Sequence, residues 1–223
     1  MLTRFSRWVG LARQLVIRML PQHSIPAAAR LLARSMADNP LHQRVFASEA
    51  ARLEPLLESA FVRLLRRQMR TGTVLGAYEG DALVGVAAMV PPGHCQPGLQ
   101  EKLAMLPILA RGGVLWRLPR IRHWLQAWAR HDPEFDHWHL GPAAVDRMRQ
   151  GQGIGSQLMV AICERLDRSQ GIGYLETDKA ENVRLYRRGG FEVVAEQPVL
   201  GVTNWFMQRP PRPRKERLMS GAT

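Results

Sequence analysis

Cysteine, lysine and long apolar segments are all scarce in this chain of 223 residues. Cys95 and Cys163 are its only cysteines, and neither stands in a C-x-x-C motif, which argues against a disulfide framework or a zinc knuckle. No apolar run approaches the roughly 18 residues of a membrane span, and the N-terminal residues lack the cleavage pattern of a signal peptide. We therefore expect a cytoplasmic protein with no transmembrane segment and no bound metal, in which Cys163 is a small packing residue.

Lysine is nearly missing although the formal net charge is +12. Lys102, Lys179 and Lys215 are the only lysines, so arginine carries most of the positive charge. The arginines are spread along the chain, and no zinc finger or helix-turn-helix pattern gathers them into one surface. We therefore do not expect nucleic acid as a partner, and assign the basicity to a solvated surface and in part to an anionic cofactor.

One stretch in the second half of the chain combines a strand pattern, several glycines and a helix pattern. An apolar run from His139 ends near Val145, glycines follow at positions 151, 153 and 155, and apolar residues then repeat at helical spacing from 158 to 166. Glycines let a phosphate approach the backbone, and the first N–H groups of a helix have no intrahelical partner. The sequence therefore predicts that a diphosphate binds at Gln150, Gly151, Gln152, Gly153, Ile154, Gly155 and Ser156.

Two common phosphate-binding patterns do not fit this turn. A dinucleotide fingerprint that starts at Gly151 would need a glycine in place of Ser156, and a P-loop would need a lysine at its end. The pattern that fits is Q/R-x-x-G-x-G/A over residues 150–155, and a second pattern, N-x-x-x-Y-x-x-x-G-F, follows from Asn182 through Tyr186 to Phe191. In this order and spacing, the two patterns resemble the GNAT N-acetyltransferase superfamily.

The resemblance implies a fold and a cosubstrate. The fold class is α/β (α+β), the GNAT fold, with a mixed central sheet of about six to seven strands, parallel strands 4 and 5 that splay apart, and flanking helices. The cosubstrate is acetyl-CoA, with its pyrophosphate on the glycine turn. Within the superfamily the segment 137–208 looks closest to puromycin N-acetyltransferase-like members, but Arg147 stands where those relatives usually have proline.

The strand before the glycine turn contains a Gly141-Pro142 pair, which can interrupt the hydrogen-bond ladder to the next strand. The resemblance implies that the two parallel strands part here, and that the pantetheine arm pairs with the backbone of Ala143, Ala144 and Val145. Backbone N–H groups in that opening can also polarise the thioester carbonyl. Asn182 matches the family residue that contacts the cofactor.

Four side chains are candidates for catalysis. Tyr186 matches the family's general acid, although a phenol with a pKa near 10 gives a proton to a thiolate with a pKa near 8.5 only if the site tunes it. Glu176, at the end of the next strand, is the first choice for the base, and His139 and His137 come next. A structural hydrogen bond for each of these groups, and binding of a cationic amine by Glu176, remain open.

The chain divides into three parts. Residues 1–15 form a basic N-terminal extension, residues 16–208 the acetyltransferase domain, and residues 209–223 a proline- and arginine-rich tail without a fold. Within the domain, 16–20 is expected as the first strand, Ser24 as a helix cap, 73–78 and 82–90 as a hairpin, and 196–198 as a turn before a last strand at 202–207. Residues 94–136 are expected as a helical insertion near the acceptor site, where His42 and Phe46 are further pocket candidates.

These observations favour an N-acetyltransferase that moves an acetyl group from acetyl-CoA to a primary amine of a small molecule, by direct attack in a ternary complex. Two alternatives stay open, a regulatory or sensor module that binds acetyl-CoA without turnover, and a protein acetyltransferase. The sequence also leaves a homodimer open and does not identify the amine.

Overall fold

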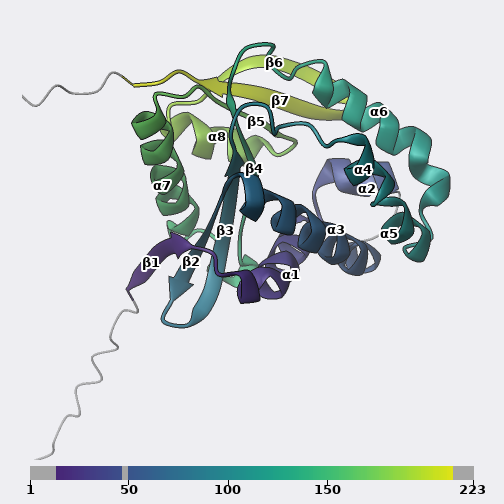
Figure 1. Cartoon of the computed structure of the whole chain (residues 1–223), viewed down its shortest axis with the longest axis horizontal. Helices are drawn as coiled ribbons and strands as arrows, with labels where there is room; N and C mark the ends of the chain where they lie inside the picture. The colour runs from purple at the N-terminus through teal and green to yellow at the C-terminus, as the bar shows by residue number, and fades with distance from the viewer. Residues whose placement is uncertain (1–13, 47–49, 213–223) are drawn as a thin grey trace, which may run out of the picture.

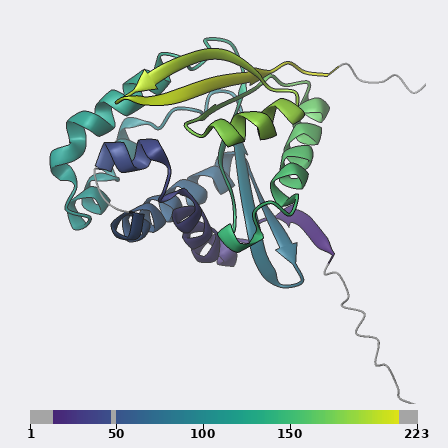
Figure 2. The same ribbon diagram turned by 180° about the vertical axis from the view of Figure 1, so that it is seen from behind.

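The computed structural model describes residues 14–46 and 50–212, which build a seven-stranded sheet with helices on both faces (Figure 1, Figure 2). The strands are β1 Leu15–Met19, β2 Thr73–Glu79, β3 Ala82–Val90, β4 Trp138–Val145, β5 Gly173–Thr177, β6 Glu192–Val199 and β7 Val202–Arg209. Their order in the sheet is β1-β2-β3-β4-β5-β7-β6. The β4–β5 pair is parallel and the other neighbouring pairs are antiparallel, so the expected mixed sheet with parallel fourth and fifth strands is confirmed.

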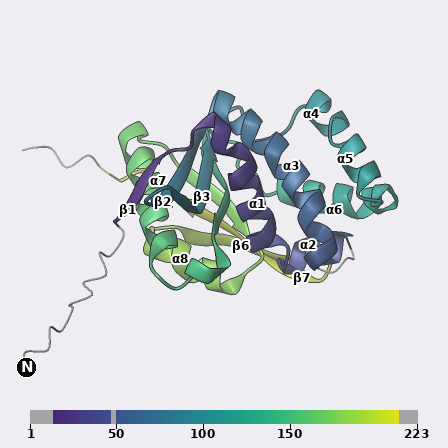
Figure 3. The same ribbon diagram turned by 90° about the horizontal axis from the view of Figure 1, so that it is seen from below.

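The helices form two layers, one on each face of the sheet (Figure 3). The α-helices of the described residues are α1 Ile25–Met36, α2 Pro40–Phe46, α3 Ala50–Thr71, α4 Leu99–Leu103, α5 Leu106–Arg111, α6 Leu118–Ala129, α7 Ile154–Ser169 and α8 Ala180–Arg188. The first three pack with α5 and α6 around one apolar core, and α7 and α8 pack with the other face of the sheet around a second core. The glycine turn and α7 therefore lie on the face of the sheet opposite the N-terminal helices.

The central strands are covered on both faces, which explains their apolar sequences. Val74 and Tyr78 of β2 belong to the core beneath α1 and α3, whereas Leu75 and Ala77 belong to the core beneath α7. A strand buried on both faces reads as a continuous apolar run, as the segments 73–78 and 82–90 do. The predicted hairpin is confirmed, with Gly80 in its turn at a φ of 62°.

The segment 94–136 is helical, as expected, and it packs against the N-terminal helices. It contains α4, α5, a short 3₁₀ turn at Leu115–Arg117 and α6. Leu109, Val114 and Ala127 are buried in the core beneath α1 and α3, and Trp128 donates from Nε1 to Asn204 Oδ1 of β7 at 3.0 Å. The insertion is therefore anchored at both the helical layer and the far end of the sheet.

The structure corrects two local expectations. Residues 196–198 are not a turn, because β6 continues through Pro198 to Val199 and the chain reverses at Leu200 and Gly201, with φ values of 52° and 79°. β6 is an edge strand, where a proline can lack a ladder N–H without leaving a neighbour unpaired. Ser24 stands before α1, but its side chain makes no capping hydrogen bond.

The expected boundaries shift slightly at both ends. Leu15 belongs to β1 rather than to the extension, and residues 1–13 lie outside the described part. Arg209 was predicted in the tail, but it closes β7 and is 1 % exposed, with Nε donating to Gly189 O at 2.9 Å and Nη2 lying 2.7 Å from Asp167 Oδ1. Residues 213–223 lie outside the described part. Among the helices described, none has the length and apolar character of a membrane span.

Candidate active site

The sheet opens between β4 and β5. The register joins the two strands at only two residue pairs and ends at His139 and Tyr174, while β4 and β5 continue along β3 and β7 on their outer sides. Gly141, with a φ of 144°, precedes Pro142 through a cis peptide bond where the strands part. The predicted interruption at Gly141-Pro142 is confirmed, and residues 143–145 border the opening.

Side chains from the N-terminal helices hold the β4 edge of this opening. Gln68 of α3 donates from Nε2 to Gly141 O at 2.6 Å, and Ser35 of α1 donates from Oγ to Val145 O at 3.0 Å. Gln150 donates from Nε2 to the same Val145 carbonyl at 3.2 Å. Because buried carbonyls need partners, these bonds stabilise a strand edge that has lost its neighbour.

The predicted phosphate-binding turn has the backbone shape that such a site requires. Gly151 and Gly153 have φ values of 77° and 82°, in the left-handed region, and α7 begins at Ile154 directly afterwards. A Cβ on either glycine would meet nothing within 4 Å, so backbone conformation rather than crowding accounts for both glycines. The N–H groups of the first turn of α7 are consequently available to an anion.

One cavity of about 730 Å³ joins this turn to the opening of the sheet. The predicted site residues that line it are Glu176, His139, Tyr186, Asn182, Ala143, Ala144, Val145, Gln150, Gly151, Gly153, Ile154, Gly155, Ser156 and His42. Gln152 is exposed and bonds to Met148 O at 3.3 Å, whereas Phe46 and His137 are buried outside the cavity lining. The structure therefore gathers most of the predicted residues around a single space.

The two parallel strands bring His139 and Glu176 into contact. His139 Nε2 lies 3.0 Å from Glu176 Oε2, and the Glu176 side chain is only 4 % exposed. Burial alone would lower the pKa of His139, but the Glu176 charge, together with Asp132 and Cys95, outweighs it and raises this pKa well above its ordinary value. An N–H at Nε2 therefore donates to the carboxylate, which stays at the edge of the cavity.

Tyr186 and Asn182 enter the same cavity from α8. Burial, and then the negative charges of Asp178 and Glu176, raise the pKa of Tyr186 to about 12. The phenol therefore keeps its proton at neutral pH and can donate it in a hydrogen bond. Asn182 donates from Nδ2 to Thr177 Oγ1 at 3.2 Å, which holds the start of α8 against the end of β5.

A compact polar cluster lies next to this pair. His137 Nε2 is 3.1 Å from Asp132 Oδ1, and His139 Nδ1 is 3.8 Å from the same oxygen. Cys95 completes the cluster. Burial would raise the pKa of its thiol, but hydrogen bonding to His137 and His139 lowers it to about 7. Burial would lower the pKa of His137, but several hydrogen bonds, of which the one to Asp132 has the largest effect, raise this pKa to about 10.

Aromatic side chains form the wall of the cavity farthest from the glycine turn. Trp124 and Trp128 of α6 stand edge to face with ring centroids 5.2 Å apart, and His42 of α2 meets Trp124 at 5.6 Å. Burial lowers the pKa of His42 below its ordinary value, and its Nδ1 lies 2.9 Å from Met36 O. Phe61 of α3 extends this apolar wall.

Charged groups mark both sides of the cavity. Asp178 accepts from Asn39 Nδ2 at 3.2 Å and from Leu41 N at 2.9 Å, so it ties the beginning of α2 to the end of β5. Arg149 and Arg188 also line the cavity, and Arg149 Nη1 lies 3.3 Å from Glu79 Oε2. Glu176 and Asp178 thus stand at the end of β5, and Arg149 stands directly before the glycine turn.

The sequence did not point to four of these groups, which are Gln68, Cys95, Asp132 and Asp178. Asp178 had a readable signal, because it follows Glu176 at a strand end where functional side chains gather. The other three are single polar residues in a helix or in loops, and they join the site only through tertiary packing.

Comparisons with known proteins agree with this geometry. Residues 120–193, a span that includes the glycine turn and Tyr186, match a family model described as an acetyltransferase (GNAT) domain. This segment, about a third of the chain, is thus similar to a GNAT acetyltransferase domain, and the enzyme class that the match indicates is that of the acyltransferases.

Solved structures show the same fold over nearly the whole of this chain. A structure of histone acetyltransferase HPA2 and related acetyltransferase from Corynebacterium glutamicum is 22% identical, with a TM-score of 0.67, and the match covers 90% of this chain and 98% of that one. Arylalkylamine N-acetyltransferase 2 from Aedes aegypti is 15% identical, with a TM-score of 0.63 over 89% and 100%. A putative acetyltransferase from Salmonella typhimurium, solved with its cofactor acetyl-CoA, is 15% identical, with a TM-score of 0.55 over 94% and 99%.

Proposed function

We propose that this protein transfers the acetyl group of acetyl-CoA to a primary amine of a small molecule, by direct attack in a ternary complex. The observation that carries this proposal is the continuity of the cavity. One space reaches from the glycine turn, through the opening between β4 and β5, to a buried carboxylate and an aromatic wall. Both substrates can therefore meet without leaving the protein.

The residues at the glycine turn fit the anionic part of acetyl-CoA. N–H groups at the start of α7 suit the pyrophosphate, and Arg149, directly before the glycine turn, and Arg188 add positive charge to the cavity lining. Residues 143–145 border an unpaired strand edge that suits the amide groups of the pantetheine arm. Bound there, acetyl-CoA supplies an acetyl group that is activated as a thioester.

We assign to Glu176 the binding and deprotonation of the amine. Its side chain is almost fully buried, so a bound ammonium would gain from the nearby negative charge more than it would in water. A protonated amine cannot attack, and the carboxylate can accept its proton directly or through one water. His139 then acts as a positioning residue, because its Nε2 lies 3.0 Å from Glu176 Oε2 and fixes that oxygen.

We assign to Tyr186 the stabilisation of the departing coenzyme A thiolate. Its pKa of about 12 keeps the phenol protonated across the physiological range, and its ring lines the cavity beside the opening. A hydrogen bond from this hydroxyl stabilises the departing thiolate. Because the site raises the pKa of Tyr186 rather than lowering it, the phenol keeps its proton and the thiolate takes a proton from solvent. Asn182, one helical turn earlier, keeps α8 in place through its bond to Thr177.

The acceptor wall favours an amine with an apolar or aromatic body. Trp124, Trp128, Phe61 and Leu64 line this part of the cavity, and the insertion that carries the two tryptophans covers it. An aromatic amine can stack on such a wall while its nitrogen meets Glu176. The similarity in fold to an arylalkylamine N-acetyltransferase points in the same direction. The likeness to puromycin N-acetyltransferases stays a prediction.

The test is thiol release from acetyl-CoA in the presence of an amine panel. The panel contains arylalkylamines, aminonucleosides of the puromycin type, polyamines and short peptides with a free N-terminus. We expect the largest kcat/KM for an arylalkylamine or an aminonucleoside. Turnover of peptides alone would favour a protein acetyltransferase. A rise in Tm with acetyl-CoA, but no turnover with any amine, would favour a sensor.

A further inference from the structure

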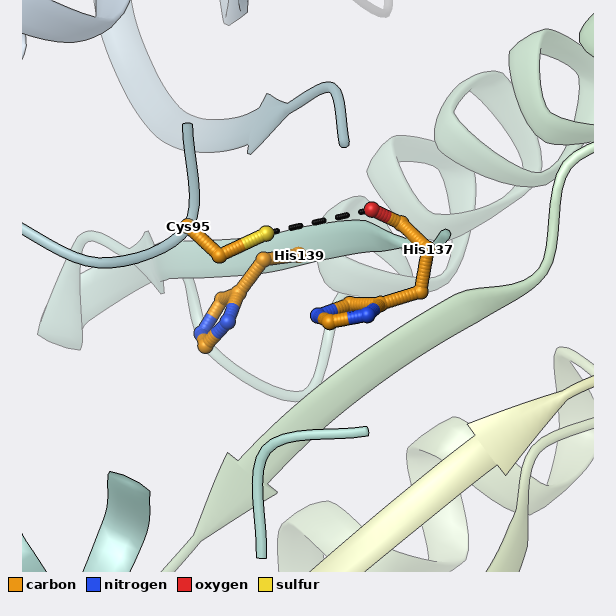
Figure 4. Close-up of side chains that lie close together, drawn as sticks. All are labelled: Cys95, His137 and His139. Carbon is orange, nitrogen blue, oxygen red and sulfur yellow. Dashed lines mark hydrogen bonds between the residues drawn. The ribbon is translucent and has the colours of Figure 1, made fainter. Parts of the chain in front are cut away.

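The cluster beside the active site has the composition of a metal centre rather than of a simple ion pair. Cys95, His137 and His139 each offer a ligand atom, and these atoms all lie within 4.8 Å of one another. Figure 4 shows the two imidazoles side by side and Cys95 on a separate loop, with its thiol directed toward the His137 carbonyl oxygen at 3.8 Å. Asp132 Oδ1 lies against both imidazoles, at 3.1 Å and 3.8 Å.

We propose that Cys95 Sγ, His137 Nε2, His139 Nδ1 and Asp132 Oδ1 bind one zinc ion. Zinc prefers four-coordinate tetrahedral sites built from thiolate, imidazole and carboxylate ligands. With metal–ligand distances of about 2.0–2.3 Å, tetrahedral ligands lie roughly 3.3–3.7 Å apart. The two distances from Asp132 Oδ1 to the imidazole nitrogens bracket that range, so small movements complete the site. On binding, the thiol proton of Cys95 and the protons on His137 Nε2 and His139 Nδ1 leave to solvent, and the thiolate and the two freed lone pairs take their places on the metal.

The strongest support comes from the atoms that face away from the cluster. His137 Nδ1 lies 2.9 Å from Phe135 O, so its N–H is directed there and Nε2 is the nitrogen that offers a lone pair to a metal once its proton has left. His139 Nε2 lies 3.0 Å from Glu176 Oε2, which leaves Nδ1 for the metal. In zinc sites, the ring nitrogen of a histidine that does not bind the metal usually donates its N–H to a backbone carbonyl or a carboxylate, as both histidines do here.

The carboxylate is held in the same way. Gln96 donates from Nε2 to Asp132 Oδ2 at 2.8 Å, so the other oxygen, Oδ1, is turned toward the histidines. His139 Nδ1, in contrast, is a buried nitrogen with no hydrogen-bond partner in the described structure. Such an atom calls for a ligand, because an unsatisfied buried polar group costs free energy.

A second, smaller cavity of about 230 Å³ gives the cluster a route to solvent. Cys95, Gln96, Asp132 and His137 line it, and Cys95 also lines the acetyl-transfer cavity. A metal ion can therefore reach the thiol and the carboxylate without passing the acetyl-CoA site.

The role of such a zinc ion is structural. With four protein ligands it keeps no open position for a substrate. Cys95 lies in the loop after β3, Asp132 lies after α6, and the two histidines lie just before and within β4. The ion would thus fasten both ends of the insertion 94–136 to the sheet. It would also orient the His139 ring so that the N–H at Nε2 points toward Glu176. This departs from the expectation of no metal, because the ligands are too far apart in sequence to form a recognisable pattern.

The test uses the full chain, purified under reducing conditions and freed of weakly bound metal. Elemental analysis should find close to one zinc ion per chain, and Tm should rise when zinc is added to the metal-free protein. Cobalt in place of zinc should give intense bands of four-coordinate cobalt and a thiolate-to-cobalt charge-transfer band. Cys95→Ala should remove the charge-transfer band and weaken zinc binding, whereas the matched control Cys163→Ala should keep both. Cys163 is a buried residue of α7, and its Sγ lies 3.5 Å from Gly189 O.

A second measurement does not depend on the folding of a variant. In the wild-type protein, zinc should protect one thiol, Cys95, from alkylation, as peptide mapping will show. A wild-type chain that takes no zinc from a chromophoric chelator would overturn the proposal. A cobalt spectrum without the charge-transfer band, or a band that survives Cys95→Ala, would do the same. None of these readouts needs acetyl transfer, so the metal site and the proposed function can fail separately.

Discussion

The two sides of the central cavity are built in different ways. The cofactor side comes from one nearly continuous stretch, in which β4, the glycine turn, α7, β5 and α8 follow one another along the chain. The acceptor side comes from separate pieces, with walls from α2, α3 and the insertion, and polar groups from the loops that flank it. A ligand common to a whole superfamily can be bound by local backbone geometry, whereas a particular amine needs side chains from several segments. The predictions below separate the two sides.

The largest effect is expected at Glu176, where the two sides meet. Glu176→Gln keeps the shape and the contact with His139 but removes the negative charge, so we expect kcat to fall by about 10²–10⁴. Binding of acetyl-CoA, followed by calorimetry, should stay unchanged. The control Glu192→Gln changes an exposed carboxyl on β6 and should keep full activity. Full activity of Glu176→Gln would remove this residue from the mechanism.

Tyr186→Phe should lower kcat by about 10²-fold, because only the hydrogen-bond donor is lost. The Kd of acetyl-CoA should stay the same. Tyr78→Phe is the matched control, since the Tyr78 hydroxyl is buried in the N-terminal core without a hydrogen-bond partner among the described residues. In the wild type, the pKa of about 12 means that the phenol stays protonated as pH rises. Loss of kcat between pH 8 and 9 that Tyr186→Phe abolishes would contradict this assignment.

Gly153→Ala tests the backbone of the cofactor side. A left-handed φ costs a residue with a Cβ about 1–2 kcal/mol, and the turn can relieve that strain only by moving its N–H groups. We expect the Kd of acetyl-CoA to rise about tenfold, which corresponds to 1.4 kcal/mol.

Gly80→Ala is the control for this variant. Gly80 has a φ of 62° and equally open surroundings, but it lies in the β2–β3 hairpin away from the cavity. Both variants should lose similar stability in urea unfolding, and only Gly153→Ala should lose affinity. Equal affinities would mean that the glycine turn does not bind the cosubstrate.

The smallest effect is expected at Arg188. This side chain lines the cavity at the end of α8, and it is exposed, so an ion pair with a phosphate is worth about 0.2–1 kcal/mol. Arg188→Gln should therefore raise the KM for acetyl-CoA by a few-fold, and added salt should reduce the difference. Arg187→Gln, an exposed neighbour that does not line the cavity, should leave KM unchanged.

The residues that line the cavity around the glycine turn could be predicted from the sequence almost one by one, whereas few of those that line its other side could. Gly151 and Gly153 could be identified because a helix that begins after left-handed glycines needs only local conformation. The pair of His139 and Glu176 could be anticipated, because both stand on parallel strands that the pattern had already placed side by side. Cys95 and Asp132 could not, since neither has a local pattern and their meeting depends on how the insertion folds back.

Arg209 shows the same limit at the end of the chain. Its position beside prolines and arginines suggested a tail, but the side chain is buried against Asp167 and the Gly189 carbonyl. From the sequence alone, an arginine in such a segment is interpreted as surface charge. Only the tertiary structure shows that Arg209 holds the end of β7 against α7.

The central claim is that both substrates occupy one continuous cavity during transfer, and initial-rate kinetics tests it most directly. Thiol release is measured while acetyl-CoA is varied at several fixed concentrations of the best amine. The account predicts double-reciprocal lines that intersect, as a ternary complex requires. Parallel lines would instead indicate a covalent acetyl-enzyme and would contradict direct transfer.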